Sequence, residues 1–271
     1  MHEHFEPGLP FKLNFPFPDI PIRLLQCRAL ENFSWPEDKE FSNPHWRLHW
    51  NQTSEGRFIL DGEEIIMEPR YIYLISPNTA FKRCSAHPVS HFYIHFLVGG
   101  EYESVIPGIY AVEADEGQLL PLFRWAAQKR KKKIESISSS IMARLLSLTF
   151  DALSEIPPDS FGKPVSDARI RLALRFLEEH LSEPCSNEAL AHHAAMGVRS
   201  FIATFKANTG KTPHQHLIEK RLDKAAILLQ FTDATIEEIA DECGFNDRNY
   251  LTRLFFRRYR IPPAAFRKHQ F

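Results

Sequence analysis

The chain has 271 residues, of which 44% are hydrophobic and 25% are charged, and its formal net charge at pH 7 is -1. This composition is typical of a soluble protein with one or two domains, and it excludes a disordered or fibrous chain. The four cysteines lie far apart without paired spacing, which predicts neither a disulfide framework nor a zinc site.

The first residues do not predict an export signal. Residues 1–21 lack a basic segment followed by an unbroken apolar run, and no run of about 18 apolar residues occurs elsewhere. We therefore expect neither secretion nor membrane insertion. A cytoplasmic location is predicted, where free cysteines stay reduced.

From about residue 20 to residue 112 the chain has the pattern of β-strands. Large apolar and polar side chains alternate at 46–50 and 91–98, and the Asp61-Gly62 pair joins two short strands as a hairpin. The pattern predicts an antiparallel, mostly β domain.

Two amphipathic helices are predicted over residues 117–155. The apolar residues of the second helix form one stripe at helical spacing: Ile137, Ile141, Leu145, Leu148 and Leu153. The basic run at 128–133 is interpreted as a solvated helix end, with a contact to nucleic acid as the alternative.

A stretch containing Pro and Ser, residues 156–165, is predicted to link a domain at 1–155 to a domain at 166–271. The second domain carries 16 Lys and Arg against 13 Asp and Glu, and the rest of the chain carries 17 against 21. This mild asymmetry alone does not indicate nucleic acid. However, residues 246–268 hold seven basic groups against one acidic group, so basic charge is concentrated near one end.

The second domain contains one unit twice. Residues 190–196 correspond to residues 239–245 at an offset of 49, and residues 201–216 correspond to 251–266 at an offset of 50. Each copy predicts a helix, a short turn and a second helix, which is the helix-turn-helix pattern. Gly244 suits the second turn because a residue that ends a helix there often needs a positive φ, which glycine adopts without steric cost.

The second helix of the second copy has a polar row opposite an apolar stripe. Its polar row contains Arg248, Asn249 and Arg253. The major groove of B-DNA admits one α-helix, and arginine and asparagine can bond guanine and adenine there with two hydrogen bonds each. A helix between the copies would hold the two units in a fixed relation through its own stripe: Ile218, Leu222, Ala225, Ala226 and Leu229.

These residues resemble the AraC/XylS family of transcription regulators. The likeness is carried by residues 190–217, 221–229 and 236–268, roughly the last hundred residues, with the spacing of the whole set. The resemblance implies two helix-turn-helix units that contact successive major grooves on one face of double-stranded DNA.

The family's two recognition helices map onto residues 198–206 and 247–257. The resemblance implies base contacts from five residues: Arg199, Ser200, Arg248, Asn249 and Arg253. It implies phosphate contacts from Lys206, Arg257 and Arg258. The first helix departs from the family pattern, since Ala203 stands where many members have arginine.

Each of these polar residues has a plainer alternative, because a surface arginine is usually solvated or paired with a carboxylate. The apolar residues of the two units are expected in the core: Met196, Phe201, Phe205, Phe245, Leu251 and Phe255. Phe266 is expected to pack under the last unit rather than to contact DNA.

The N-terminal domain resembles the small cupin-type barrel with dimer-forming helices found in many family members, which gives the chain an α+β fold. The resemblance implies effector sensing. Five residues are candidates for binding an effector such as a sugar: Trp46, Trp50, His91, Tyr93 and His95. The alternative is that the two tryptophans belong to the barrel core.

Two other functions stay open. Cupin enzymes bind a metal through histidines and a carboxylate, but the predicted β domain has no tight His-x-His followed by a spaced Glu, so neither metal nor cofactor is predicted. A cupin-type enzyme fused to a DNA-binding domain, or an architectural DNA-binding protein without a ligand, remain the alternatives. The preferred prediction is a non-enzymatic, dimeric regulator whose partners are DNA, a small effector and RNA polymerase.

Overall fold

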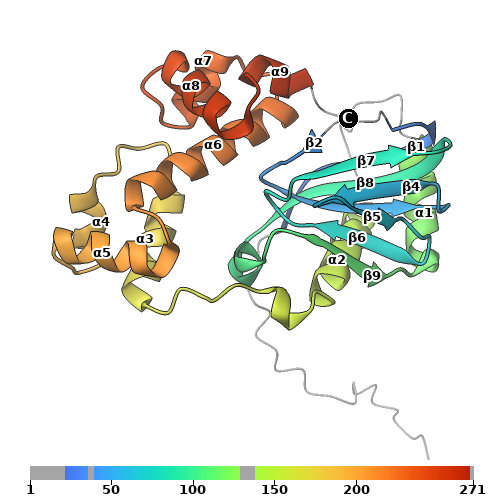
Figure 1. Ribbon diagram of the computed structural model, residues 1–271, viewed down its shortest axis with the longest axis horizontal. Helices are drawn as coiled ribbons and strands as arrows, with labels where there is room; N and C mark the ends of the chain where they lie inside the picture. Colours follow the sequence, from blue (N-terminus) through green and yellow to red (C-terminus); the bar gives the residue numbers. More distant parts are fainter. Residues whose placement is uncertain (1–21, 36–39, 129–137, 269–271) are drawn as a thin grey trace, which may run out of the picture.

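The structure, a computed structural model, describes residues 22–35, 40–128 and 138–268. Residues 22–113 form antiparallel sheets and are called the sheet region here, and residues 168–268 form helices and are called the helical region. The two regions lie side by side, and an extended segment joins them along one edge (Figure 1). The described part of the chain therefore has the predicted α+β fold.

The sheet region contains two antiparallel sheets. One has five strands in the order β1-β8-β3-β6-β9, and the other has four in the order β2-β7-β4-β5. The strands are β1 (Ile22–Phe33), β2 (Glu40–Phe41), β3 (Trp46–Asn51), β4 (Gly56–Leu60), β5 (Glu63–Ile66), β6 (Tyr71–Ile75), β7 (Phe81–Ser85), β8 (Val89–Val98) and β9 (Ile109–Glu113). Asp61 and Gly62 join β4 to β5 with φ of 52° and 88°, which confirms the predicted hairpin.

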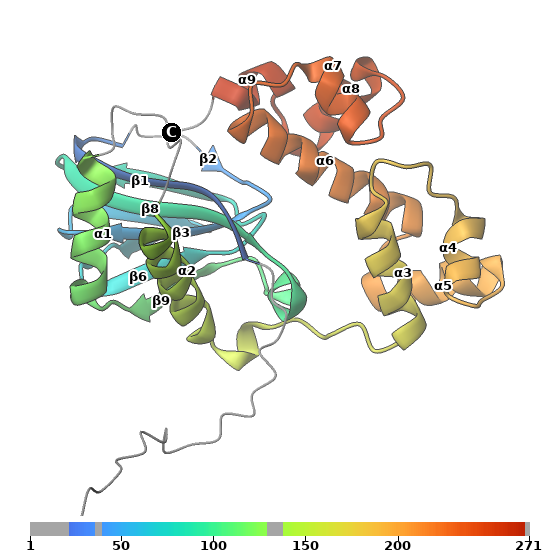
Figure 2. The same cartoon turned by 180° about the vertical axis from the view of Figure 1, so that it is seen from behind.

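Two helices cover the outer face of the five-stranded sheet. They are α1 (Glu116–Gln128) and α2 (Ser139–Ser154), and Figure 2 shows both lying across that sheet. Leu145 and Leu148 of α2 are buried in the same core as Trp46 and Trp50 of β3. The inner face of the sheet packs toward the four-stranded sheet around a second core that includes Phe58. This cupin-like arrangement places polar side chains of β3 and β8 between the sheets.

Part of the apolar stripe predicted for the second helix, α2, is confirmed. Leu145, Leu148 and Leu153 are buried, and Ile141 packs against the same core. Ile137 and most of the basic run at 128–133 lie outside the described residues. No described helix combines the length and the apolar composition that a membrane span requires.

The helical region contains two helix-turn-helix units on either side of a long helix. Unit 1 consists of α4 and α5, and unit 2 consists of α7 and α8. The elements that follow the sheets are η1 (Gly100–Ser104), η2 (Pro158–Ser160), α3 (Ala168–Glu179), α4 (Asn187–His193), α5 (Val198–Thr209), α6 (Pro213–Phe231), α7 (Ile236–Glu242), α8 (Arg248–Tyr259) and α9 (Pro263–Lys268). The predicted recognition helices at 198–206 and 247–257 therefore correspond to α5 and α8.

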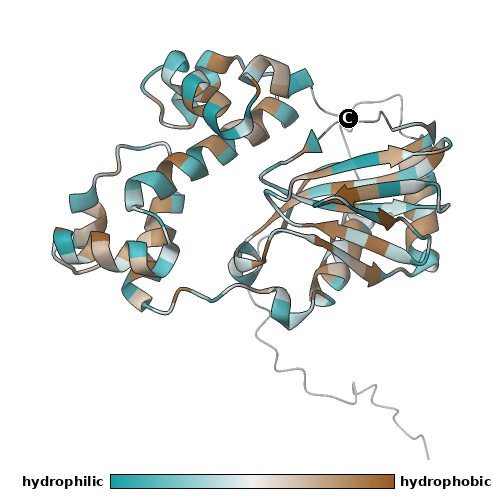
Figure 3. Ribbon diagram, viewed as in Figure 1, coloured by the Kyte–Doolittle hydropathy of each residue, from teal (hydrophilic) through white to brown (hydrophobic). Residues whose placement is uncertain are grey.

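The long helix α6 contributes to the cores of both units. Leu217, near its start, packs in the core of unit 1, while Leu222 and Leu229 pack in the core of unit 2. Thr212 begins the helix as a capping box with Gln215, and Pro213 occupies its first turn. Apolar residues on α6 and on the helices around it lie among polar ones, as the hydropathy colouring shows (Figure 3).

Candidate functional site

The polar row of α8 is exposed in the folded chain. Arg248, Asn249 and Arg253 are all exposed, while Leu251 and Phe255 on the opposite side are fully buried. Asp247 caps the helix by accepting a hydrogen bond from the backbone of Tyr250 at 2.8 Å. The helix thus presents hydrogen-bonding side chains outward from a sealed core.

The corresponding helix of unit 1 has a less polar exposed side. Arg199 and Ser200 are exposed, as is Ala203, while Phe201 and Phe205 are fully buried. Gly197 begins α5 without a side-chain cap. Between the first turn of α5 and Lys206, the outward side offers fewer hydrogen-bonding groups than that of α8.

The turns of the two units have the same backbone conformation but different residues. Gly244 has a φ of 73°, and Ala195, its counterpart in unit 1, has a φ of 50°. The prediction for Gly244 is confirmed. A Cβ at Gly244 would lie 2.6 Å from the carbonyl oxygen of Ser182, so glycine is required there by close packing as well as by φ.

Arg221 of α6 fixes the turn of unit 2 to the loop after α3. Its guanidinium donates to the carbonyl oxygens of Leu181, Glu183 and Gly244, each at 2.7 Å. Its side chain is buried, and each of its three nitrogens donates to one carbonyl oxygen, without a carboxylate as partner. The relative placement of the two units therefore depends on this one side chain as well as on α6.

The three predicted phosphate contacts have different surroundings. Lys206 and Arg257 are exposed. Arg258 donates to Asp223 at 2.7 Å and to Asn78 of the sheet region at 3.2 Å. In this arrangement Arg258 holds the helical region against the sheet region, so it is not free to reach a phosphate.

All seven residues of the helical region that were predicted to pack in a core do so, although Met196 is only partly buried. Phe266 is buried in the core of unit 2, and Met196 packs against the core of unit 1. The fully or nearly fully buried members are Phe201, Phe205, Phe245, Leu251 and Phe255.

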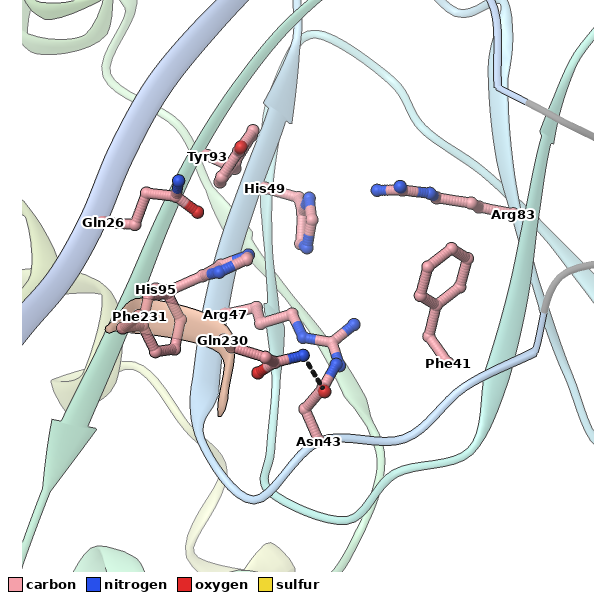
Figure 4. A pocket seen from close by; sticks show the side chains of 10 residues that line it. All are labelled: Gln26, Phe41, Asn43, Arg47, His49, Arg83, Tyr93, His95, Gln230 and Phe231. Carbon is pink, nitrogen blue, oxygen red and sulfur yellow. Dashed lines mark hydrogen bonds between the residues drawn. The ribbon is translucent and has the colours of Figure 1, made fainter. Parts of the chain in front are cut away.

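A second candidate site lies at the mouth of the sheet region, where α6 ends. Its ten lining side chains come from five strands or their flanking loops and from the end of α6 (Figure 4). They are Gln26, Phe41, Asn43, Arg47, His49, Arg83, Tyr93, His95, Gln230 and Phe231. The free space among them is about 30 Å³, room for roughly two water molecules. We call it the inter-sheet cavity.

A chain of hydrogen bonds leads from the core to this cavity. The Nδ1 of His91 lies 2.7 Å from the Oδ1 of Asn51, and its Nε2 lies 2.9 Å from the Nδ1 of His49. Burial lowers the pKa of His49 and of His91 well below the usual value, so both rings are neutral at pH 7. With His91 donating to Asn51 and His49 donating to His91, the Nε2 of His49 is left as an acceptor without a partner.

Two arginines extend into the same cavity (Figure 4). Arg47 is 4% exposed and Arg83 is 7% exposed. Burial, and for Arg47 also the neighbouring Arg83, lowers their pKa values to about 9 and about 10 respectively. Their guanidinium groups lie over the rings of Phe81 and Phe41, at 5.1 and 4.3 Å from the ring centroids. Both side chains remain charged at neutral pH.

The structure divides the five predicted effector residues between two faces of one sheet. Tyr93 and His95 line the cavity, and His91 lies behind His49. Trp46 and Trp50 point to the other face, into the core beneath α1 and α2. The two tryptophans therefore do not contribute to this cavity, because alternate residues of β3 face opposite sides.

Only Tyr93 and His95 of the ten lining residues are among the five predicted effector residues. The other eight were not predicted, among them Arg47, Arg83, Gln230 and Phe231. Arg83 could have been found, because it lies two residues after Phe81 on the same strand and therefore faces the same side. Phe81 is buried between the sheets. Gln230 and Phe231 could not be found this way, since they reach the cavity from the helical region. Among the described residues, no group of three or more His, Cys, Asp or Glu side chains is placed to hold a metal ion.

Comparisons with known proteins identify the helical region. A family model described as a helix-turn-helix domain matches residues 190–269. The HTH-type transcriptional activator RhaS of Salmonella schwarzengrund (strain CVM19633) is 36% identical over 107 residues, which cover 40% of this chain and 38% of that protein. RhaS of Escherichia fergusonii matches with the same identity and coverage. Residues 190–269 are therefore a helix-turn-helix domain of the AraC/XylS type.

The sequence match concerns one part of each protein, since the chain spans only 38% of the length of these curated relatives. A likeness of the whole chain comes from structure. ToxT from Vibrio cholerae aligns over 92% of this chain and 98% of its own, with a TM-score of 0.53 and 10% identity. At that identity the likeness shows a shared fold, which includes the sheet region.

Proposed function

We propose that this protein is a sequence-specific DNA-binding transcription regulator. The observation that supports it most strongly is the exposed row of Arg248, Asn249 and Arg253 on a helix whose opposite side is sealed in a core. Unit 1 repeats the arrangement with Arg199 and Ser200. The residues of both rows contact base edges, while Lys206 and Arg257 contact phosphates.

The sheet region acts as the sensor of a small-molecule effector. The support is the inter-sheet cavity, which lies at the contact between the sheet region and α6. The effector changes how the two helix-turn-helix units are presented to DNA. This mechanism requires no covalent chemistry, and the matching curated relatives are named as transcriptional activators.

The protein works in the cytoplasm as a homodimer through the helices near residues 117–155, and it affects RNA polymerase at the promoter. The dimer proposal is supported by Phe150 of α2, a large apolar side chain that is 40% exposed. Chemical crosslinking and mass measurement of the full chain test it, and a monomer at micromolar concentration would contradict it.

DNA recognition is tested by selecting bound sequences from a random pool with the full chain and with the Arg253→Ala variant. The wild type should enrich one motif. The variant should lose preference at the position that Arg253 contacts, which corresponds to about 1–3 kcal/mol of discrimination. Arg175→Ala is the matched control, because Arg175 is an exposed arginine on α3. Unchanged discrimination by Arg253→Ala would contradict its role.

The sensor is tested by deleting residues 1–160. The remaining helical region has two cores of its own, so it should stay folded and keep some specific DNA binding without any effector response. A retained response would place the sensor in the helical region instead.

A further inference from the structure

The inter-sheet cavity concentrates positive charge without a counter-charge. Two arginines and two histidines line it, and none of its ten lining residues is an Asp or a Glu. No salt bridge among the described residues involves Arg47 or Arg83. The Nε atoms of both are buried without a hydrogen-bond partner.

Such an arrangement is unfavourable in a folded protein unless something else supplies the partner. A buried charge is strongly destabilising when it is neither paired nor hydrogen-bonded. The ring contacts with Phe41 and Phe81 compensate only in part, because a ring accepts no directional hydrogen bond from the edge of a guanidinium. A guanidinium best fits the planar or tetrahedral oxygens of a carboxylate or phosphate.

We propose that the inter-sheet cavity binds the oxyanion of a small anionic effector between Arg47 and Arg83, beneath a cap formed by Gln230 and Phe231. This rests on the proposed function, in which the sheet region senses an effector, and it names the chemical class of that effector. The free Nε2 of His49 adds an acceptor for a hydroxyl group of the ligand. A hydroxy acid or a sugar phosphate fits both features.

The cap connects the ligand to the DNA-binding helices. The amide Nε2 of Gln230 donates to the Oδ1 of Asn43 at 2.7 Å, and the ring of Phe231 packs 5.3 Å from that of His45. Because the free space holds only about two water molecules, a larger anion must displace some of the side chains that line it, and in our proposal these are the last two residues of α6. Leu229, directly before them, is buried in the core of unit 2, so the displacement reaches that unit.

The test uses thermal unfolding of the full chain with probes that differ in charge and little in shape. The pairs are lactate and lactamide, benzoate and benzamide, and glucose 6-phosphate and glucose, with inorganic phosphate added alone and chloride matching ionic strength. At least one anion should raise the Tm by about 3–6 °C at roughly ten times its Kd. Its neutral partner should not.

Substitutions at the cavity test whether the anion-dependent rise in Tm comes from the two arginines. Arg47→Met/Arg83→Met should lose the anion-dependent shift, and without ligand its Tm should equal or exceed that of the wild type, since two uncompensated charges are removed. Arg57→Met is the matched control, because Arg57 lies on the surface of the same region, paired with Glu64 at 3.1 Å. Phe231→Ala leaves both arginines in place and should keep the anion preference.

Three outcomes would overturn the proposal: equal protection by the anionic and neutral members of every pair, an equal shift in the double arginine variant, or no anion that protects the wild type more than that variant. Selection of DNA sequences by the full chain distinguishes failure of the anion site from failure of the proposed regulator function. If anions bind at the two arginines but the full chain selects no DNA sequence, the regulator proposal fails and the anion site stands. If the full chain selects a DNA sequence but no anion binds, the anion site fails and the regulator proposal stands.

Discussion

Unit 1 and unit 2 share one fold but differ in their exposed polar residues and in their turns. Unit 2 has a polar row with two arginines and an asparagine, an aspartate cap on α8, and a glycine at the left-handed position of its turn. Unit 1 has one arginine and a serine in its row, no side-chain cap on α5, and Ala195 at the same left-handed position. The buried aromatic cores are alike in both.

The comparison shows that the repeated helix-turn-helix is maintained by its core, while its outer face and turn can diverge. A core of Phe201 and Phe205, or of Leu251 and Phe255, positions a helix whatever its outward residues are. We therefore expect unit 2 to dominate sequence discrimination and unit 1 to contribute mainly affinity. Five variants test this comparison of the two units, from the largest expected effect to the smallest.

Gly244→Ala should lower the free energy of unfolding by about 3 kcal/mol. The added Cβ would be forced against the carbonyl oxygen of Ser182 and the Nη2 of Arg221, in a left-handed backbone conformation. Urea denaturation of the full chain measures it. A loss below about 1 kcal/mol would mean that the turn of unit 2 is as adaptable as that of unit 1.

Arg248→Ala should weaken binding to the selected DNA by about 2 kcal/mol, whereas Arg199→Ala should cost less than about 1 kcal/mol. Both arginines are exposed near the start of their recognition helices, so they form a matched pair across the repeat. Fluorescence anisotropy at fixed salt compares them. Equal losses would show that the two units contribute equally.

Ala203→Arg should strengthen DNA binding by roughly tenfold at low salt, because it adds a donor to the exposed face of unit 1. Binding titrations at two salt concentrations should also show a steeper salt dependence. No gain in affinity would indicate that α5 does not approach DNA closely.

Ala195→Gly should raise the free energy of unfolding by about 0.5–1 kcal/mol. The φ of 50° at this alanine is strained, and glycine relieves that strain by more than it costs in the entropy of the unfolded chain. Urea denaturation of the Ala195→Gly and Gly244→Ala variants, measured side by side, compares the two turns. A destabilised Ala195→Gly variant would show that the methyl group contributes packing that offsets the strain.

Much of the fold could be predicted from periodicity. The helical stripe of α6, the repeat at residues 190–266 and the Asp61-Gly62 hairpin are local patterns, and local patterns report local structure. The pairing of β1 with β8 and the order of strands in the two sheets could not be derived, because strand pairing depends on contacts between residues far apart in the sequence.

The site was predictable to different extents. The polar row of α8 follows from helical spacing alone, so Arg248 and Arg253 were correctly expected on an exposed face. The contact of Arg258 with Asn78 was not predictable, because Asn78 belongs to another region of the chain. The face of β3 that lines the cavity was equally undetermined, since alternation separates two faces without telling which one is covered by helices.

The contribution of α6 to three structures at once limits how this protein can be rebuilt. Leu217 belongs to unit 1, Leu229 to unit 2, and Gln230 and Phe231 to the wall of the inter-sheet cavity. A chimaera that receives a foreign sensor in place of residues 22–155 would keep a helix end shaped for the original one. Engineered regulators made from this scaffold should therefore exchange residues 230 and 231 together with the sensor, although both lie far downstream in the sequence.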